Sequence, residues 1–177
     1  MTPARALRAE AATRVLIKDG PYGTGIQAEK LPAEAYCARL DLMKDQKGNN
    51  DLLNLTQPAI VRSICEGFAK AGAEVLATNT FNANRISQAD YGAEELAAEM
   101  NRASARIVRE VAGRFAAADG RPRWVAGAVG PTNKTLSLSP KVNDPAYREV
   151  DFDTVKQVYR EQIDALAEGG VDFILVE

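Results

Sequence analysis

The sequence predicts an α/β protein with parallel strands, and more specifically the N-terminal half of a (β/α)₈ (TIM) barrel. Short β-branched runs alternate with long stretches of helical periodicity, which is typical of parallel strands joined by right-handed crossovers. Long polar loops follow the first three strands, whereas the loops that enter the second and fourth strands are short. Loops that carry function at the carboxyl ends of strands favour the barrel. An open doubly wound sheet is the alternative.

Four strands are expected, at residues 14–18, 74–78, 123–128 and 171–176. The fourth is nearly all apolar, as expected for a sheet that is covered on both faces. A complete barrel needs about 250 residues, and this chain of 177 residues stops directly after the fourth strand. We therefore expect a partial barrel over residues 14–177, preceded by a flexible N-terminal segment at residues 1–13.

Helices are expected between the strands. A short helix is predicted near residues 33–43, where Pro32 suits a first turn. The first long helix is predicted to begin with Thr56 as its N-cap, and the third with Asp151 or Asp153. Each long helix shows one apolar stripe. The stripes are Val61, Ile64, Cys65 and Phe68, then Leu96, Met100, Ala103, Ile107 and Val111, then Val155, Tyr159, Ile163 and Leu166.

The charge balance argues against nucleic-acid and membrane partners. The chain has 22 Lys and Arg against 24 Asp and Glu, a net charge of −2, which offers no attraction for polyanions. No apolar run approaches the roughly 20 residues that span a bilayer, and residues 1–12 lack the apolar stretch of a signal peptide. We expect a cytoplasmic protein.

The residue counts exclude several kinds of catalytic site. The chain has no histidine, so it cannot form a Ser-His-Asp triad, a Cys-His dyad or an imidazole metal site. Its two cysteines, Cys37 and Cys65, cannot by themselves make a four-ligand zinc site. We expect Cys65 to be a small buried apolar residue, Cys37 to be incidental, and no disulfide between them.

Two glycine-containing runs resemble nucleotide-binding motifs. Residues 23–28 match GxGxxA, but no helix is expected to open there and the next strand lies about 50 residues away, outside a ∼30-residue βαβ unit. Residues 127–135 resemble a P-loop, but Asn133 stands where the motif requires glycine. We predict no nucleotide site at either run.

Polar residues at the strand ends are candidates for ligand binding. Asp19 and Glu177 end the first and fourth strands, so in a barrel both carboxylates point into the mouth, where they can hold a cation such as an α-ammonium group. The alternative is a turn aspartate and a solvated strand end. Residues 78–82, TNTFN, can bind a carboxylate through backbone N–H groups, or serve only as a turn.

Several loops resemble one family. The runs are GNNDLLNLTQP at 48–58, TNTFN at 78–82, ISQADYG at 86–92, GAVGPTNKT at 127–135 and VNDP at 142–145. From about Arg14 to Glu177 the chain resembles the N-terminal homocysteine-binding module of cobalamin-dependent methionine synthases. Other homocysteine methyltransferases, such as the betaine-dependent enzymes, share the strand-end pattern more than these loops. The resemblance implies a (β/α)₈ barrel that binds homocysteine at its C-terminal face.

The resemblance also implies roles for individual residues. Asp19, Gly20 and Glu177 match the positions that contact the amino group of homocysteine and, through the backbone, its carboxylate. Thr78 matches a further backbone donor. The implied reaction transfers a methyl group from methylcobalamin to a zinc-bound homocysteine thiolate and gives methionine, a step of methionine biosynthesis.

The implied cofactors are zinc and cobalamin. In the family three cysteines of the later barrel strands hold the zinc, and neither Cys37 nor Cys65 matches them. We therefore assign no catalytic residue and no metal ligand here, and expect the isolated chain to be inactive. The implied partners are homocysteine, the remaining half of the barrel, and the cobalamin- and folate-binding modules of the full-length protein.

One departure affects the substrate loop. Pro21-Tyr22 and Gly25 stand where the family usually has Ala-Met and Met, and proline lacks an N–H, so a backbone donor is expected to be lost. Two alternatives remain open. One is a homocysteine methyltransferase that uses a small methyl donor such as betaine or S-methylmethionine, and the other is a non-catalytic half-barrel.

Overall fold

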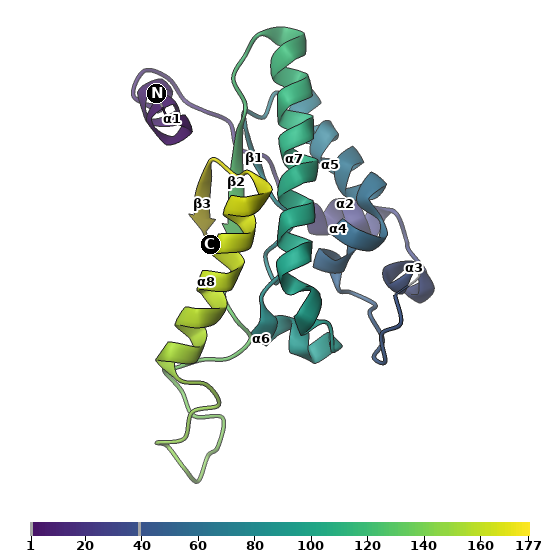
Figure 1. The fold of residues 1–177 in the computed structure, drawn as a ribbon, viewed down its shortest axis with the longest axis vertical. Helices are drawn as coiled ribbons and strands as arrows, with labels where there is room; N and C mark the ends of the chain where they lie inside the picture. The colour runs from purple at the N-terminus through teal and green to yellow at the C-terminus, as the bar shows by residue number, and fades with distance from the viewer. Residues whose placement is uncertain (1, 39) are drawn as a thin grey trace.

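The computed structural model of the chain describes residues 2–38 and 40–177. Its centre is a parallel sheet of β1 (Val75–Ala77), β2 (Trp124–Val129) and β3 (Phe173–Val176), which lie side by side in chain order. The helices α5 (Pro58–Lys70), α7 (Ala97–Asp119) and α8 (Phe152–Gly169) pack together along one face (Figure 1). The mixed α/β class and the parallel strands are confirmed.

Shorter helices fill the connections. They are α1 (Pro3–Ala11), α2 (Tyr22–Ala28), α3 (Ala33–Cys37), α4 (Leu53–Thr56) and α6 (Arg85–Gln88), with 3₁₀ turns at Asn50–Leu52, Ala89–Tyr91 and Glu94–Leu96. None of the helices in the described part of the chain is both long and apolar enough to span a membrane.

The segment predicted as the first strand is not a regular strand. Residues 14–18 form only a parallel bridge between Lys18 and Val75, and the N–H of Glu74 donates to the carbonyl oxygen of Ile17 at 2.8 Å. The segment nevertheless lies beside β1, in the place predicted for it. The sheet order therefore follows the chain without the reversal that a doubly wound sheet contains.

One predicted helix start is wrong, one is confirmed, and one helix was not expected. Thr56 is the last residue of α4, and Gln57 precedes α5 without a capping side chain. Asp151 caps α8, because its carboxylate accepts the N–H of Thr154 at 2.7 Å. A short helix, α2, begins at Tyr22 and contains the whole GxGxxA run, where no helix was expected.

Successive side chains of the strands point to opposite faces of the sheet, and both faces are apolar. Leu76 and Val125 pack against α5 and α7, together with Val61, Cys65 and Val111. The stripe predicted on α5 faces this core, as do Ile107 and Val111 of α7. Met100 and Leu96 pack instead in a separate cluster with Leu52, and Ala103 is only half-buried.

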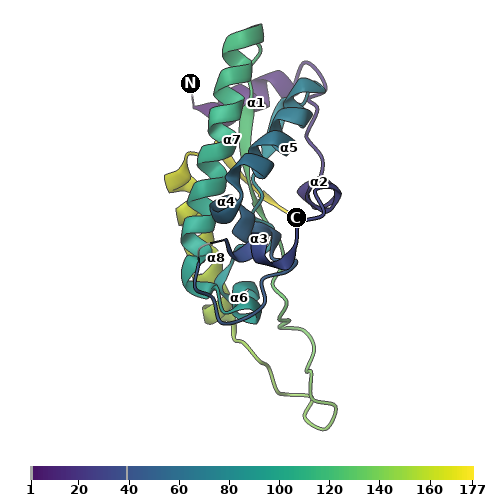
Figure 2. The same ribbon diagram turned by 90° about the vertical axis from the view of Figure 1, so that its right-hand side faces the viewer.

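On the opposite face, Trp124 and its neighbours on the strands pack with Leu7 of α1. The segment predicted as flexible therefore contains a helix, which lies at the opposite end of the molecule from the loop of residues 130–151 (Figure 2). Its mobility in solution stays a prediction.

The predicted stripe of α8 is partly wrong. Ile163 is 37% exposed, and the buried side includes Val158, Gln162 and Leu166. Gln162 is buried because its amide donates to the carbonyl oxygen of Thr80 at 2.8 Å. A polar side chain at the centre of the buried face cannot be read from an apolar stripe.

We predict that the chain self-associates through its two outer strand segments. Val15, Ile17 and Val176 are 86%, 57% and 77% exposed, and unpaired strand edges invite pairing with another chain. Ile17→Lys and Val176→Lys should each lower the weight-average mass in sedimentation. Val142→Lys, at a 94% exposed loop position, is the matched control and should change nothing. A wild-type chain that stays monomeric at all concentrations contradicts this prediction.

Candidate functional site

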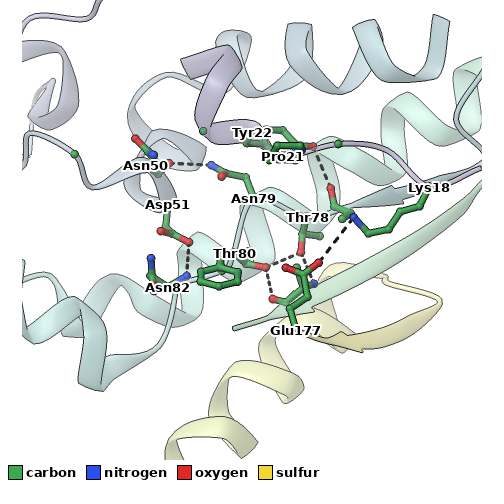
Figure 3. Close-up of a pocket in the computed structure, with 16 residues that line it drawn as sticks. Lys18, Pro21, Tyr22, Asn50, Asp51, Thr78, Asn79, Thr80, Asn82 and Glu177 are labelled. Carbon is green, nitrogen blue, oxygen red and sulfur yellow. Dashed lines mark hydrogen bonds and ion pairs between the residues drawn. The ribbon is translucent and has the colours of Figure 1, made fainter. Parts of the chain in front are cut away.

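A cavity of about 350 Å³ opens at the carboxyl ends of the strands. Residues from several strand ends and loops form its wall (Figure 3). They are Lys18 and residues 20–23, Gly48, Asn50 and Asp51, the residues 77–82 that end and follow β1, Ala128 of β2, and Glu177. The strand ends therefore meet at one site, as the parallel arrangement predicts, and the TNTFN run forms part of its wall.

Asp19 binds the end of β1. Its Oδ2 accepts the N–H of Ala77 at 2.7 Å, and its Oδ1 accepts a hydrogen bond from Lys18 Nζ at 3.1 Å. The side chain is fully shielded from solvent. Burial raises the pKa of the Asp19 carboxyl, while the bonds from Ala77 and Lys18 oppose the rise. Asp19 thus lies behind the cavity wall, between two residues that line it.

Glu177 lies in the cavity wall at the end of β3. Its N–H donates to the carbonyl oxygen of Val129 at 3.0 Å, which extends the pairing of β2 and β3. Its carboxylate is 35% exposed and lies 3.8 Å from Lys18 Nζ. The two predicted carboxylates are therefore brought together, with the ammonium group of Lys18 between them.

The Asp-Gly-Pro-Tyr segment turns the chain into the site. A side chain at Gly20 would place a Cβ 2.9 Å from the ring of Phe68, so the close approach requires glycine. Gly20 lines the cavity, and its N–H has no acceptor within the described part of the chain. Pro21 precedes α2 as its N-cap, and the hydroxyl of Tyr22 donates to the carbonyl oxygen of Ala77 at 3.1 Å.

The N–H of Thr78, which the resemblance implies as a donor to the ligand, is engaged in the sheet in this structure. Its N–H donates to the carbonyl oxygen of Ala126 at 2.9 Å, so the sheet already uses this donor. Its hydroxyl accepts the N–H of Ala128 at 2.9 Å and lies 2.6 Å from the Thr80 hydroxyl, which donates to the carbonyl oxygen of Ala128. Thr78 lines the cavity, but its polar groups tie β1 to β2.

Asp51 is a site residue that the sequence pattern did not single out. It lines the cavity and is 5% exposed, and its Oδ1 accepts the N–H of Asn82 at 3.0 Å. Burial raises the pKa of this carboxyl to about 7. The sequence did contain an indication of this position, because Asp51 lies in the polar GNND run directly before the buried residues Leu52 and Leu53.

The described residues do not fit a metal site. No three His, Cys, Asp or Glu side chains converge to hold a metal ion in residues 2–38 and 40–177. Cys65 is fully buried, and burial raises the pKa of its thiol to about 12, which opposes the thiolate that zinc requires. Cys37 is half-buried in α3. We therefore derive no step through zinc from this chain.

Comparison with known proteins gives a family match over most of the chain. The family model for homocysteine S-methyltransferase matches residues 16–177. Among solved structures, the metallated form of the homocysteine methyltransferase MmuM from Escherichia coli matches with a TM-score of 0.72 and 19% identity, over 99% of this chain and 57% of that one. The oxidized form matches with a TM-score of 0.70 and 19% identity, over 98% and 56%. The structural likeness shows the fold, and the chain spans little more than half the length of MmuM.

We predict that Asp51 makes the folded chain less stable as pH rises. Its folded-state pKa of about 7 lies above the unfolded value of 3.8, so between these values the folded state binds more protons and loses stability as they leave. The slope is at most about 1.4 kcal/mol per pH unit. Urea unfolding from pH 4.5 to 7.5 should show a flatter profile for Asp51→Asn than for the wild type.

The matched control for this measurement is Asp41→Asn, which changes an exposed carboxylate on a nearby loop and should keep the wild-type slope. Asp19 is present in all three proteins, so its own titration cancels in the comparison. Equal slopes for Asp51→Asn and the wild type would show that Asp51 does not titrate in this way.

Proposed function

The chain belongs to the homocysteine S-methyltransferase family, and we propose that it is the homocysteine-binding half of a (β/α)₈ methyltransferase barrel. The observation that carries the proposal is the cavity where the strand ends meet. Its volume of about 350 Å³ is at the lower end of the roughly 300–1,000 Å³ of ligand pockets, which suits a small amino acid. Strands that follow one another in chain order support a half-barrel.

We propose that Glu177 and Asp19 receive the ammonium group of homocysteine. The side chain of Glu177 lines the cavity and is 35% exposed, and Asp19 lies 3.1 Å from a cation already in place. The free N–H of Gly20 can donate to the ligand's carboxylate, as can the N–H groups of Thr80 and Phe81, because the other N–H groups of the TNTFN run already have acceptors. Thr78 contributes by holding that loop to β2 through its hydroxyl, in place of the direct contact expected from the sequence.

In this proposal the described residues bind and orient homocysteine. Methyl transfer forms a carbon–sulfur bond and breaks the bond between the methyl group and its donor. It needs the thiol to lose its proton, and a free thiol has a pKa of about 8.5. The cavity wall contains no histidine or cysteine to assist this step. Activation of the thiol, which the family resemblance attributes to zinc, is therefore proposed for the part of the barrel beyond this chain.

The proposed methyl donor is methylcobalamin, as in methionine synthases. The support is the set of loop runs that resemble that group, including GNND at the cavity and the loop after β2. A small donor such as betaine or S-methylmethionine is the alternative, and a non-catalytic half-barrel is a second one. The other proposed partners are the second half of the barrel and cobalamin- and folate-binding modules.

We predict that L-homocysteine binds to the chain and that Glu177→Gln weakens the binding. A charge-assisted hydrogen bond contributes roughly 1.5–3 kcal/mol, so the dissociation constant measured by calorimetry should rise by about one to two orders of magnitude. Asp19→Asn should also weaken the binding, because it removes a negative charge. Its amide oxygen can still accept the N–H of Ala77, so the local structure should be kept. Glu34→Gln, on an exposed face of α3, is the control. Unchanged affinity in both site variants would show that Asp19 serves only the turn and that Glu177 is only a charge at a strand end.

We also predict that the isolated chain forms no methionine. The described residues orient homocysteine but do not activate its thiol, so incubation with homocysteine and methylcobalamin, betaine or S-methylmethionine should give no product above a no-protein control. Mass spectrometry of the reaction mixture provides the measurement. Product with any one donor would show that the chain carries the chemistry and would identify that donor.

A further inference from the structure

Lys18 places a cation where the ammonium group of the ligand is proposed to bind. Its Nζ lies 3.1 Å from Asp19 Oδ1 and 3.8 Å from Glu177 Oε1, and its side chain lines the cavity (Figure 3). The cluster therefore contains two carboxylates that are partly neutralised before any ligand arrives. Neither the family match nor the proposed binding mode gives Lys18 a role.

Asp19 is shielded from a ligand while Lys18 is in place. Its Oδ2 accepts the N–H of Ala77 and its Oδ1 accepts Lys18 Nζ, and the side chain has no exposed surface. An ammonium group that enters the cavity can reach Asp19 only where Lys18 Nζ now lies. Glu177 is also paired with Lys18, through Oε1 at 3.8 Å, but its side chain is 35% exposed and lines the cavity, so an entering ammonium group can reach it directly.

We propose that Lys18 is a tethered competitor, whose ammonium group occupies the place of the ligand's α-ammonium and is displaced by it. This inference rests on the proposed function. Lys18 can move aside, because its side chain is 41% exposed and a lysine has a long, flexible stem that can extend into solvent. Binding is then an exchange of one ammonium group for another, so the carboxylates remain paired in both states.

The exchange makes the site selective for ligands that carry an ammonium group. A ligand with the thiol and carboxylate of homocysteine but no amino group cannot replace Lys18 at Asp19. If Lys18 instead binds the carboxylate of the ligand, removing its charge should weaken the binding of both ligands. The two roles can therefore be separated with one variant and two ligands.

The test compares Lys18→Met with the wild-type chain by calorimetry, using L-homocysteine and 4-mercaptobutanoate, which lacks the amino group. Lys18→Met should bind homocysteine about tenfold more tightly, the change expected from removing one competing charge-assisted hydrogen bond. Its affinity for 4-mercaptobutanoate should stay the same. Lys18→Arg keeps the cation and should resemble the wild type, and Lys156→Met, on the exposed side of α8, is the control for loss of a lysine.

Each outcome decides the inference. Tighter homocysteine binding by Lys18→Met supports it, as does binding by Lys18→Met where the wild type shows none. Unchanged affinity, or weaker binding of both ligands, overturns it and leaves the proposed function standing. No homocysteine binding by any of the proteins contradicts the proposed function, and this inference with it. Thermal unfolding of each variant verifies that it is folded, and Lys18→Gln replaces Lys18→Met if the latter is not.

Discussion

The end of β1 is held by two buried hydrogen bonds to Ala77, and the site depends on them. The N–H of Ala77 donates to Asp19 and its carbonyl oxygen accepts the hydroxyl of Tyr22. A hydrogen bond to a charged group contributes roughly 1.5–3 kcal/mol. These bonds place the segment that carries Lys18 and Gly20 beside β1, although it contributes only a single bridge to the sheet. Backbone hydrogen bonds of Ile17 and Asp19 to Glu74 and Val75 support the same side of the cavity.

Side-chain hydrogen bonds join the loop that follows β1 to the neighbouring strand and helix, beyond the backbone hydrogen bonds of the sheet. The hydroxyls of Thr78 and Thr80 join the loop after β1 to Ala128 of β2, and Gln162 of α8 donates to Thr80. Asn54 and Asn79 similarly tie the turn at residues 48–54 to the same loop, because each amide donates to a backbone carbonyl oxygen across the gap. Short polar side chains in the TNTFN and GNND runs thus hold the cavity wall together, which explains why so many of them are buried.

The sequence predicted those features that depend on local periodicity or on strand order. The apolar stripes of α5 and α7, the parallel strands and the convergence of Asp19 with Glu177 follow from patterns that one segment or the fold class determines. The contacts of Lys18, Asp51 and Thr78 depend on which groups remain free after the chain has packed. That information is not local, because the partners Ala126 and Asn82 lie far from Thr78 and Asp51 in the sequence.

The central claim is that the cavity at the strand ends binds homocysteine by its ammonium group. The most direct measurement is a crystal structure of the chain with L-homocysteine, at a ligand concentration that saturates binding in solution. The account predicts homocysteine in the cavity, with its nitrogen about 3 Å from a carboxylate oxygen of Glu177, which is hydrogen-bond distance. An empty cavity, or homocysteine bound with its ammonium group directed away from Glu177 and Asp19, would contradict it.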